Sequence, residues 1–222
     1  MIRLFVMKTD EINADILLDK MSLLSSDEKT RVLKYRHEED RVRSLSARLM
    51  LFKYALCFKE EKYKDINFVT SPEEFSKENV NSFEIEYAEN GKGYINGCEN
   101  VFYNISHSGS YSVCALSDRE IGVDIQEIRD INENVARRFF SLKDNDFINF
   151  ELSDKRDRFI KVWTVKESFA KLTGRGIAQG METFYEDFEN NKILSVADNS
   201  QIAEFKEFAI DKDYYCFASF FE

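Results

Sequence analysis

The sequence predicts an α+β protein made of two similar α/β lobes, related by a pseudo-twofold axis, each with helices packed on a mainly antiparallel sheet. Two observations lead to this prediction. Each half of the 222 residues runs from helical patterns to strand patterns. The composition, 43% apolar and 14% aromatic, supplies enough side-chain volume for packed cores. We place the boundary near residue 103, which gives lobes over residues 1–103 and 104–222.

The first half opens with the strand pattern IRLFVM and continues with helices to about Lys59. Ser25, followed by Glu28, has the spacing of a capping box that starts a helix. The segment AENGKGYING predicts a turn between two short strands. Apolar residues at three- and four-residue steps predict the buried stripe of one helix: Val42, Leu45, Leu49, Phe52 and Leu56.

The second half begins with three strand patterns, VFYNIS, YSVCALS and IGVDIQEI, which predict an antiparallel meander. Helical patterns follow over residues 132–150 and 154–172. Strands are expected near residues 184–188, 192–196 and 214–220.

Charge and composition exclude several classes of function. With 31 basic and 41 acidic residues, the net charge of −10 disfavours binding to nucleic acid, which depends on neutralising phosphates. The four cysteines form no CxxC pair, so neither a disulfide framework nor a zinc site is indicated. We see no membrane-length apolar run and no signal-peptide pattern at the start, and therefore expect a cytoplasmic protein without membrane contact. We also expect a monomer.

Two acids lie in segments where their simplest interpretation is a solvated side chain. In IGVDIQ, the strand period of two sends Asp124 and Gln126 to the face opposite the aliphatic residues. In VWTVKESFAKL, the helical period puts Trp163, Glu167 and Lys171 on one face. A surface Glu–Lys pair would add only about 0.3 kcal/mol to helix stability. The only tryptophan of the chain on that face indicates partial enclosure, where an ion pair is costly unless it serves a ligand.

A third segment, FYNISHSGSY, gathers Ser106, His107 and a glycine directly after a predicted strand. Backbone N–H and hydroxyl groups in such a place can hold an anion, although a lone histidine there is commonly a capping or core-edge residue.

These three segments together resemble the Sfp-type 4'-phosphopantetheinyl transferases, which modify carrier proteins of peptide, polyketide and fatty-acid synthases, and the similarity extends across nearly the whole chain. The resemblance implies transfer of the 4'-phosphopantetheine arm of coenzyme A to a serine of an apo acyl or peptidyl carrier protein. It further implies Mg²⁺ (or Mn²⁺) as cofactor, 3',5'-ADP as leaving group and an active site at the interface of the lobes.

The resemblance also implies roles for individual residues. Asp124 and Glu167 occupy metal-binding positions, and Lys171 the position of a lysine that contacts the cofactor phosphates. His107 matches a histidine that meets the 3'-phosphate. The other contacts with coenzyme A fall on Arg31, Arg43, Ser44, Lys92 and Ser106.

Three positions depart from the family pattern. Gln126 replaces a second strand acid, where it can offer the metal a neutral oxygen or orient a water. Asp144 stands where a glutamate is proposed as general base, so the base is Asp144 or Glu167. Glu28 lies where a lysine is common.

Two other functions fit parts of the pattern. A Mg²⁺-dependent nuclease also combines a strand aspartate with a later acid and lysine, but the net charge and the helical pattern around Glu167 disfavour it. A module that binds coenzyme A or a carrier protein without catalysis is suggested only by Gln126, since Asp124, Glu167 and Lys171 all remain.

Overall fold

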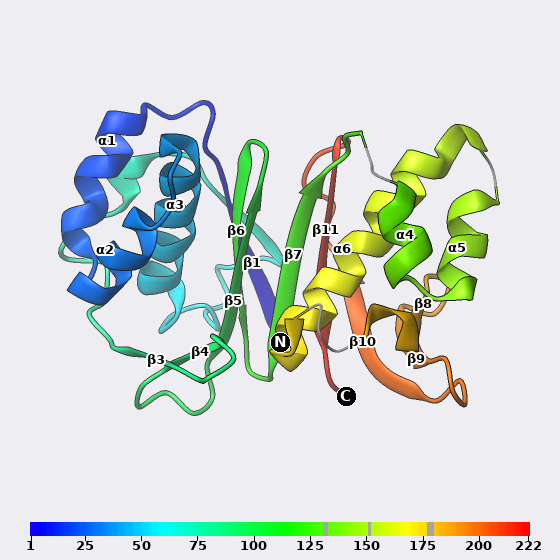
Figure 1. Ribbon diagram of the computed structural model, residues 1–222. Helices are drawn as coiled ribbons and strands as arrows, with labels where there is room; N and C mark the ends of the chain where they lie inside the picture. The colour runs from blue at the N-terminus through cyan, green and yellow to red at the C-terminus, as the bar shows by residue number, and fades with distance from the viewer. Residues whose placement is uncertain (131–132, 151, 177–179) are drawn as a thin grey trace. The chain divides into compact units, whose positions relative to one another are not determined.

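The computed structural model describes residues 1–130, 133–150, 152–176 and 180–222 (Figure 1). The chain divides into two compact units, Met1–Arg119 and Glu120–Glu222, each with its own apolar core. Within the described ranges, no helix is long and apolar enough to cross a membrane.

The first unit packs helices on a four-stranded sheet in the order β2-β1-β6-β5, in which only β1 and β2 run parallel. A separate hairpin joins β3 and β4. Its elements, in chain order, are β1 (Ile2–Lys8), α1 (Ala14–Asp19), a 3₁₀ turn (Lys20–Leu23), α2 (Ser26–Leu33), α3 (Glu38–Tyr54), β2 (Ile66–Val69), a 3₁₀ turn (Pro72–Glu74), β3 (Ile85–Tyr87), β4 (Gly93–Ile95), β5 (Phe102–Ser108) and β6 (Tyr111–Ser117).

Local sequence explains the helices of this unit. Ser25 caps α2, because its side chain accepts the N–H of Glu28. The predicted stripe on α3 is buried from Val42 to Phe52 and packs against the sheet. Leu56, the last member of that stripe, is 55% exposed because α3 ends at Tyr54, short of the predicted end at Lys59.

The second unit packs its helices on a five-stranded antiparallel sheet in the order β7-β11-β10-β9-β8. Helix α6 lies along β7 and β11, and α5 packs on α6 (Figure 1). Its elements, in chain order, are β7 (Ile121–Glu127), α4 (Glu133–Phe139), α5 (Leu142–Asn149), a 3₁₀ turn (Leu152–Asp154), α6 (Lys155–Thr173), a 3₁₀ turn (Met181–Thr183), β8 (Phe184–Asp187), β9 (Lys192–Ser195), β10 (Gln201–Glu207) and β11 (Tyr214–Phe220).

The observed boundary between the units, after Arg119, differs from the predicted one near residue 103. Strand β6 pairs with β1 along its whole length, from Ile2↔Ser117 to Lys8↔Tyr111, which fixes β5 and β6 in the first unit. The predicted meander is therefore divided, because β7 pairs with β11 in the second sheet. The spacing of strand patterns cannot reveal such long-range pairing.

Two further differences come from local signals. The helix predicted over 132–150 is two helices, because Ser141 caps α5 in a capping box and so interrupts the run; Asn132 lies outside the described residues. Strand β10 was not predicted, although its middle residues alternate between buried and half-buried positions as in a strand with one face on the core.

Helix α6 and strand β7 approach each other most closely at Gly122. A Cβ atom at Gly122 would lie under 3.0 Å from the carbonyl oxygen of Ser168 and from backbone atoms of Leu172. Next to this contact, the hydroxyls of Ser168 and Ser219 hydrogen bond at 2.6 Å and join α6 to β11. Only a residue without a side chain fits on β7 at this point.

We therefore predict that Gly122→Ala lowers the free energy of unfolding by about 2 to 3 kcal/mol, because backbone must move to admit the methyl group. The control is Gly97→Ala, at a glycine with open space around it and φ of +75°, where only the left-handed conformation costs about 1 kcal/mol. Urea unfolding of both variants checks the prediction. Equal stability losses would show that the contact of α6 with β7 is not tight.

Candidate functional site

Asp124 projects from β7 into a polar contact with helix α6. The strand alternates as the sequence predicts, with Ile121, Val123 and Ile125 fully buried, while Asp124 is 3% exposed on the other face. The ammonium of Lys171 lies 2.7 Å from Asp124 Oδ1 and also donates to the carbonyl oxygen of Val123 at 3.0 Å. The predicted strand acid and helix lysine are thus in direct contact.

Glu167 lies one helical turn before Lys171 and is half-buried. Burial raises the pKa of Glu167, the nearby Asp124 carboxylate raises it further, and Lys171 works in the opposite direction. Two carboxylates and one ammonium therefore share this place. The cluster has an excess of negative charge that a bound cation would offset.

Gln126 belongs to the same cluster, as the alternation of β7 predicts. Its amide nitrogen donates to Asp124 Oδ2 at 2.9 Å. The site thus presents carboxylate and amide oxygens, the ligands suited to Mg²⁺, which commonly takes one or two protein carboxylates and keeps several waters. Within the described residues no three His, Cys, Asp or Glu side chains form a metal-binding group, so a cation here would rely on Asp124 and Glu167.

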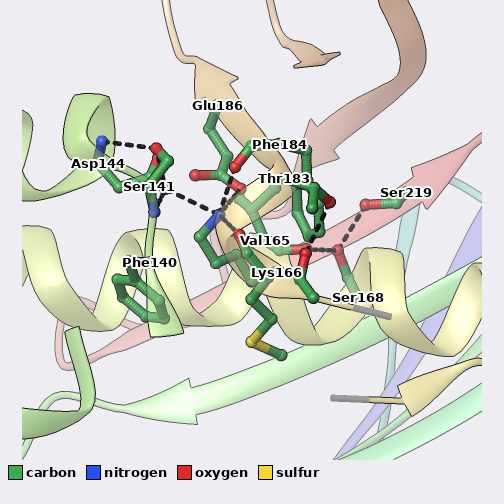
Figure 2. Close-up of polar contacts among 12 residues, drawn as sticks. Phe140, Ser141, Asp144, Val165, Lys166, Ser168, Thr183, Phe184, Glu186 and Ser219 are labelled. Atoms are coloured by element: carbon green, nitrogen blue, oxygen red, sulfur yellow. Dashed lines mark hydrogen bonds and ion pairs between the residues drawn. The ribbon is translucent and has the colours of Figure 1, made fainter. Parts of the chain in front are cut away.

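Asp144, one of the two residues predicted as general base, is not in the described contacts of this cluster. Its carboxylate is 2% exposed, caps the start of α5 with Ser141 and lies 2.9 Å from the ammonium of Lys166 (Figure 2). An acid held by a buried lysine and a capping box cannot reach a substrate hydroxyl without breaking both.

In the first unit, Arg31 belongs to a cluster around a buried acid. Glu28, 3% exposed, lies 3.6 Å from the Arg31 guanidinium and 2.8 Å from that of Arg48. The hydroxyl of Tyr87 donates to Glu28 at 2.6 Å, and Arg31 stacks 3.3 Å over the Tyr87 ring. The glutamate that departs from the family pattern is therefore the centre of an arginine network.

Ser44, one of the predicted contacts with coenzyme A, lies in the interior of the first unit. It is fully buried, and its hydroxyl accepts a hydrogen bond from Arg48 at 2.6 Å. Ser44 and Arg48 are one helical turn apart on α3, and Arg48 also contacts Glu28.

Arg43 and His107 lie near each other beside the β5–β6 turn. Arg43 donates to the carbonyl oxygen of Gly109 at 2.9 Å and pairs with Asp40 at 2.7 Å. Arg43 lowers the pKa of Asp40, and the charge of His107 contributes in the same direction. The imidazole lies 5.6 Å from the Tyr35 ring. His107 is within β5, which continues to Ser108, whereas the sequence predicts that it follows the strand.

The remaining predicted contacts differ in exposure. Ser106 is 6% exposed in β5. Lys92 lies in the turn between β3 and β4, half-buried, with its ammonium 5.9 Å over the Tyr94 ring.

The first unit also holds a cavity of about 390 Å³ beside Arg43. Acidic residues outnumber basic ones in its lining, which includes Asp10, Glu38 and Glu39. It is therefore poorly suited to a phosphate.

Two polar residues of the folded interior, half-buried Arg48 and buried Glu186, were not singled out from the sequence. Arg48 pairs with Glu28, and only the fold brings these two residues together. Glu186 was not considered, yet its place in FYEDF carries a signal: strand alternation puts it on the same face as Phe184 and Phe188. An acid on an apolar strand face is unusual enough to note from sequence alone.

Family models match nearly all of the chain. A model described as 4'-phosphopantetheinyl transferase, N-terminal, matches residues 13–119, and one described as the 4'-phosphopantetheinyl transferase superfamily matches residues 120–218. The chain belongs to this family. The two matches meet at the boundary between the structural units.

Similar proteins bear the same description. The 4'-phosphopantetheinyl transferase Sfp of Bacillus subtilis is 26% identical over 87% of this chain and 80% of that protein. A transferase of Aneurinibacillus migulanus is 27% identical over 89% of this chain and 76% of its own length. A second Bacillus subtilis transferase is 30% identical over 57% of this chain and 58% of that protein.

Membership of this family makes the chain an enzyme of the 4'-phosphopantetheinyl transferase class, whose members act on coenzyme A and carrier proteins. The predicted α+β class with two units is confirmed. The roles of single residues, the metal and the location of the site between the units stay predictions.

Proposed function

We propose that the protein transfers the 4'-phosphopantetheine arm of coenzyme A to a serine of an apo acyl or peptidyl carrier protein, with Mg²⁺, and releases 3',5'-ADP. The observation that carries this proposal is the cluster of Asp124, Glu167 and Lys171 in a chain of this family. Two carboxylates and a lysine in one cluster are what a magnesium-assisted phosphoryl transfer needs.

The reaction replaces one P–O bond with another. The serine oxygen attacks the phosphorus that carries the pantetheine arm, and the bond from that phosphorus to 3',5'-ADP breaks. Mg²⁺, held by Asp124 and Glu167, would neutralise charge on the pyrophosphate oxygens. Lys171, already oriented by Asp124 and the carbonyl of Val123, would donate to a phosphate oxygen.

Glu167 is the proposed acceptor of the serine proton. It would take the proton directly or through a metal-bound water. Asp144, the other candidate, is held by Ser141 and Lys166 in the buried interior.

The nucleotide end of coenzyme A would meet the first unit. His107, Arg43, Arg31 and Lys92 supply the donors, and buried Ser106 would support His107 within β5. Ser44 is withdrawn from this set because Arg48 takes its hydroxyl. The Glu28 network would hold Arg31 in place.

Intact-mass measurement tests the proposal. The protein is incubated with coenzyme A, Mg²⁺ and a panel of apo carrier proteins, and a carrier is expected to gain one phosphopantetheine group. Binding of coenzyme A without any such gain would favour the non-catalytic binding module, and cleavage of DNA under the same conditions would favour the nuclease.

We predict that Asp124→Ala and Glu167→Ala each reduce transfer at least about 100-fold, since each removes a proposed metal ligand. The control is Glu182→Ala, an exposed acid of the same unit, which is expected to keep full activity. Circular dichroism confirms that each variant is folded. Near-normal transfer by either variant at limiting Mg²⁺ would refute the metal assignment.

His107→Ala and Lys92→Ala are predicted to raise the KM for coenzyme A about tenfold with little change in kcat, because each would lose a charge-assisted contact far from the reacting phosphorus. Comparison of coenzyme A with dephospho-coenzyme A tests whether His107 binds the 3'-phosphate. If the His107 variant still prefers coenzyme A over dephospho-coenzyme A as strongly as the unaltered enzyme, the 3'-phosphate is bound elsewhere.

Gln126→Glu is predicted to lower the Mg²⁺ concentration that gives half-maximal transfer. The new carboxylate replaces an amide 2.9 Å from Asp124 and adds negative charge beside the proposed cation. The transfer rate of the variant and of the unaltered protein is measured over a range of Mg²⁺ concentrations. An unchanged half-saturating concentration would remove Gln126 from the site, and slower transfer would indicate that its amide donates to a phosphate oxygen.

A further inference from the structure

The second unit buries a lysine together with two carboxylates. The ammonium of Lys166, whose side chain is fully buried, lies 2.9 Å from Asp144 Oδ2 and 3.3 Å from Glu186 Oε1 (Figure 2). The same ammonium donates to the carbonyl oxygens of Met181 and Phe184, each at 2.9 Å. One helix side chain thereby contacts α5, β8 and the turn before β8.

If both acids are ionised, the cluster carries a net negative charge and has fewer hydrogen-bond donors than acceptors. A lysine ammonium has three N–H donors, and four acceptors surround it. Neither oxygen of Glu186 meets a donor in hydrogen-bond geometry among the described residues. A fully buried carboxylate without a hydrogen-bond donor is strongly unfavourable, because it has lost the hydrogen bonds that water gave it.

We propose that Glu186 remains a neutral carboxylic acid whose O–H donates a hydrogen bond to the Asp144 carboxylate, so that Lys166, Asp144 and Glu186 form a net-neutral buried cluster. Burial and the charge of Asp144 raise the pKa of Glu186 well above its ordinary value, against the opposing effect of Lys166. The groups that face Glu186 are Asp144 from α5 and Lys166 from α6, while β9 pairs Ile193 with it. A proton between the two acids supplies the missing donor.

The cluster makes Glu186 a positioning residue for Glu167, an inference that rests on the proposed function. Lys166 and Glu167 are consecutive on α6, so their side chains point about 100° apart around the helix axis. Holding the Lys166 ammonium at four acceptors fixes the rotation of α6. That rotation directs Glu167 and Lys171 toward Asp124 on β7.

The first test concerns the proton and does not depend on catalysis. The folded chain would keep the proton on Glu186 while the unfolded chain releases it above the ordinary pKa of 4.5, so stability falls as pH rises through the range between the two values. Glu186→Gln, which is neutral and can donate to Asp144, removes this dependence. The control is Glu189→Gln, the same substitution at an exposed residue nearby.

Urea unfolding is followed by the fluorescence of Trp163, the only tryptophan, which lies on α6 and stacks on Phe159. Between about pH 5 and pH 8, the unfolding constant of the unaltered protein should rise relative to that of Glu186→Gln by up to about tenfold per pH unit. Glu189→Gln should follow the unaltered protein. A ratio that stays constant over this range would show that Glu186 is ionised in the fold and would overturn the proposal.

The second test concerns positioning. Glu186→Leu fills similar space without a donor and should raise the half-saturating Mg²⁺ concentration for transfer about tenfold, whereas Glu186→Gln restores the unaltered value. Equal Mg²⁺ dependence of the two variants would refute the positioning role. If the unaltered protein transfers nothing, the proposed function and the positioning role fail together, and the pH dependence still decides the state of Glu186.

Discussion

Helix α6 approaches strand β7 so closely at Gly122 that no side chain fits between them, and the candidate site depends on this approach. The contact sets the distance between a strand that carries Asp124 and a helix that carries Glu167 and Lys171. The hydrogen bond between Ser168 and Ser219 holds the same helix against β11. The small residues Gly122, Ser168 and Ser219 therefore allow the close contact that brings Asp124 near Glu167 and Lys171.

The same helix has two clusters of one lysine and two carboxylates, and their surroundings differ. Lys171 with Asp124 and Glu167 is partly open, with the lysine side chain 29% exposed, so a cation from solvent can offset the excess negative charge. Lys166 with Asp144 and Glu186 is closed, so a proton is the only small cation that can do so. In our account, one cluster supplies chemistry and the other keeps the helix in the orientation that chemistry requires.

Sequence patterns predicted the parts of this arrangement that depend on local periodicity. The alternation in IGVDIQ placed Asp124 and Gln126 on one strand face, and the spacing of Glu167 and Lys171 placed both on one helix face. The pairing of β6 with β1 was not predictable, because nothing in a strand pattern names its partner. For the same reason, the boundary was placed too early in the chain.

Burial was the other property that the sequence could not supply. Asp144 and Ser44 have residue types suited to catalysis and ligand binding, but Lys166 and Arg48 take their polar atoms in the folded chain. Glu28 looked like a departure at a basic position, and the fold shows it as the acid that three partners share. Whether a polar residue faces a ligand or another residue depends on contacts between distant segments.

The central claim is that α6 and β7 together form one divalent-cation site. Crystals grown with Mn²⁺ and coenzyme A test it most directly, since Mn²⁺ can replace Mg²⁺ at oxygen ligands and gives an anomalous signal. The account predicts a single strong anomalous peak within bonding distance of both the Asp124 and Glu167 carboxylates. A peak that lies away from either carboxylate, or none at this place when coenzyme A is bound, would contradict it.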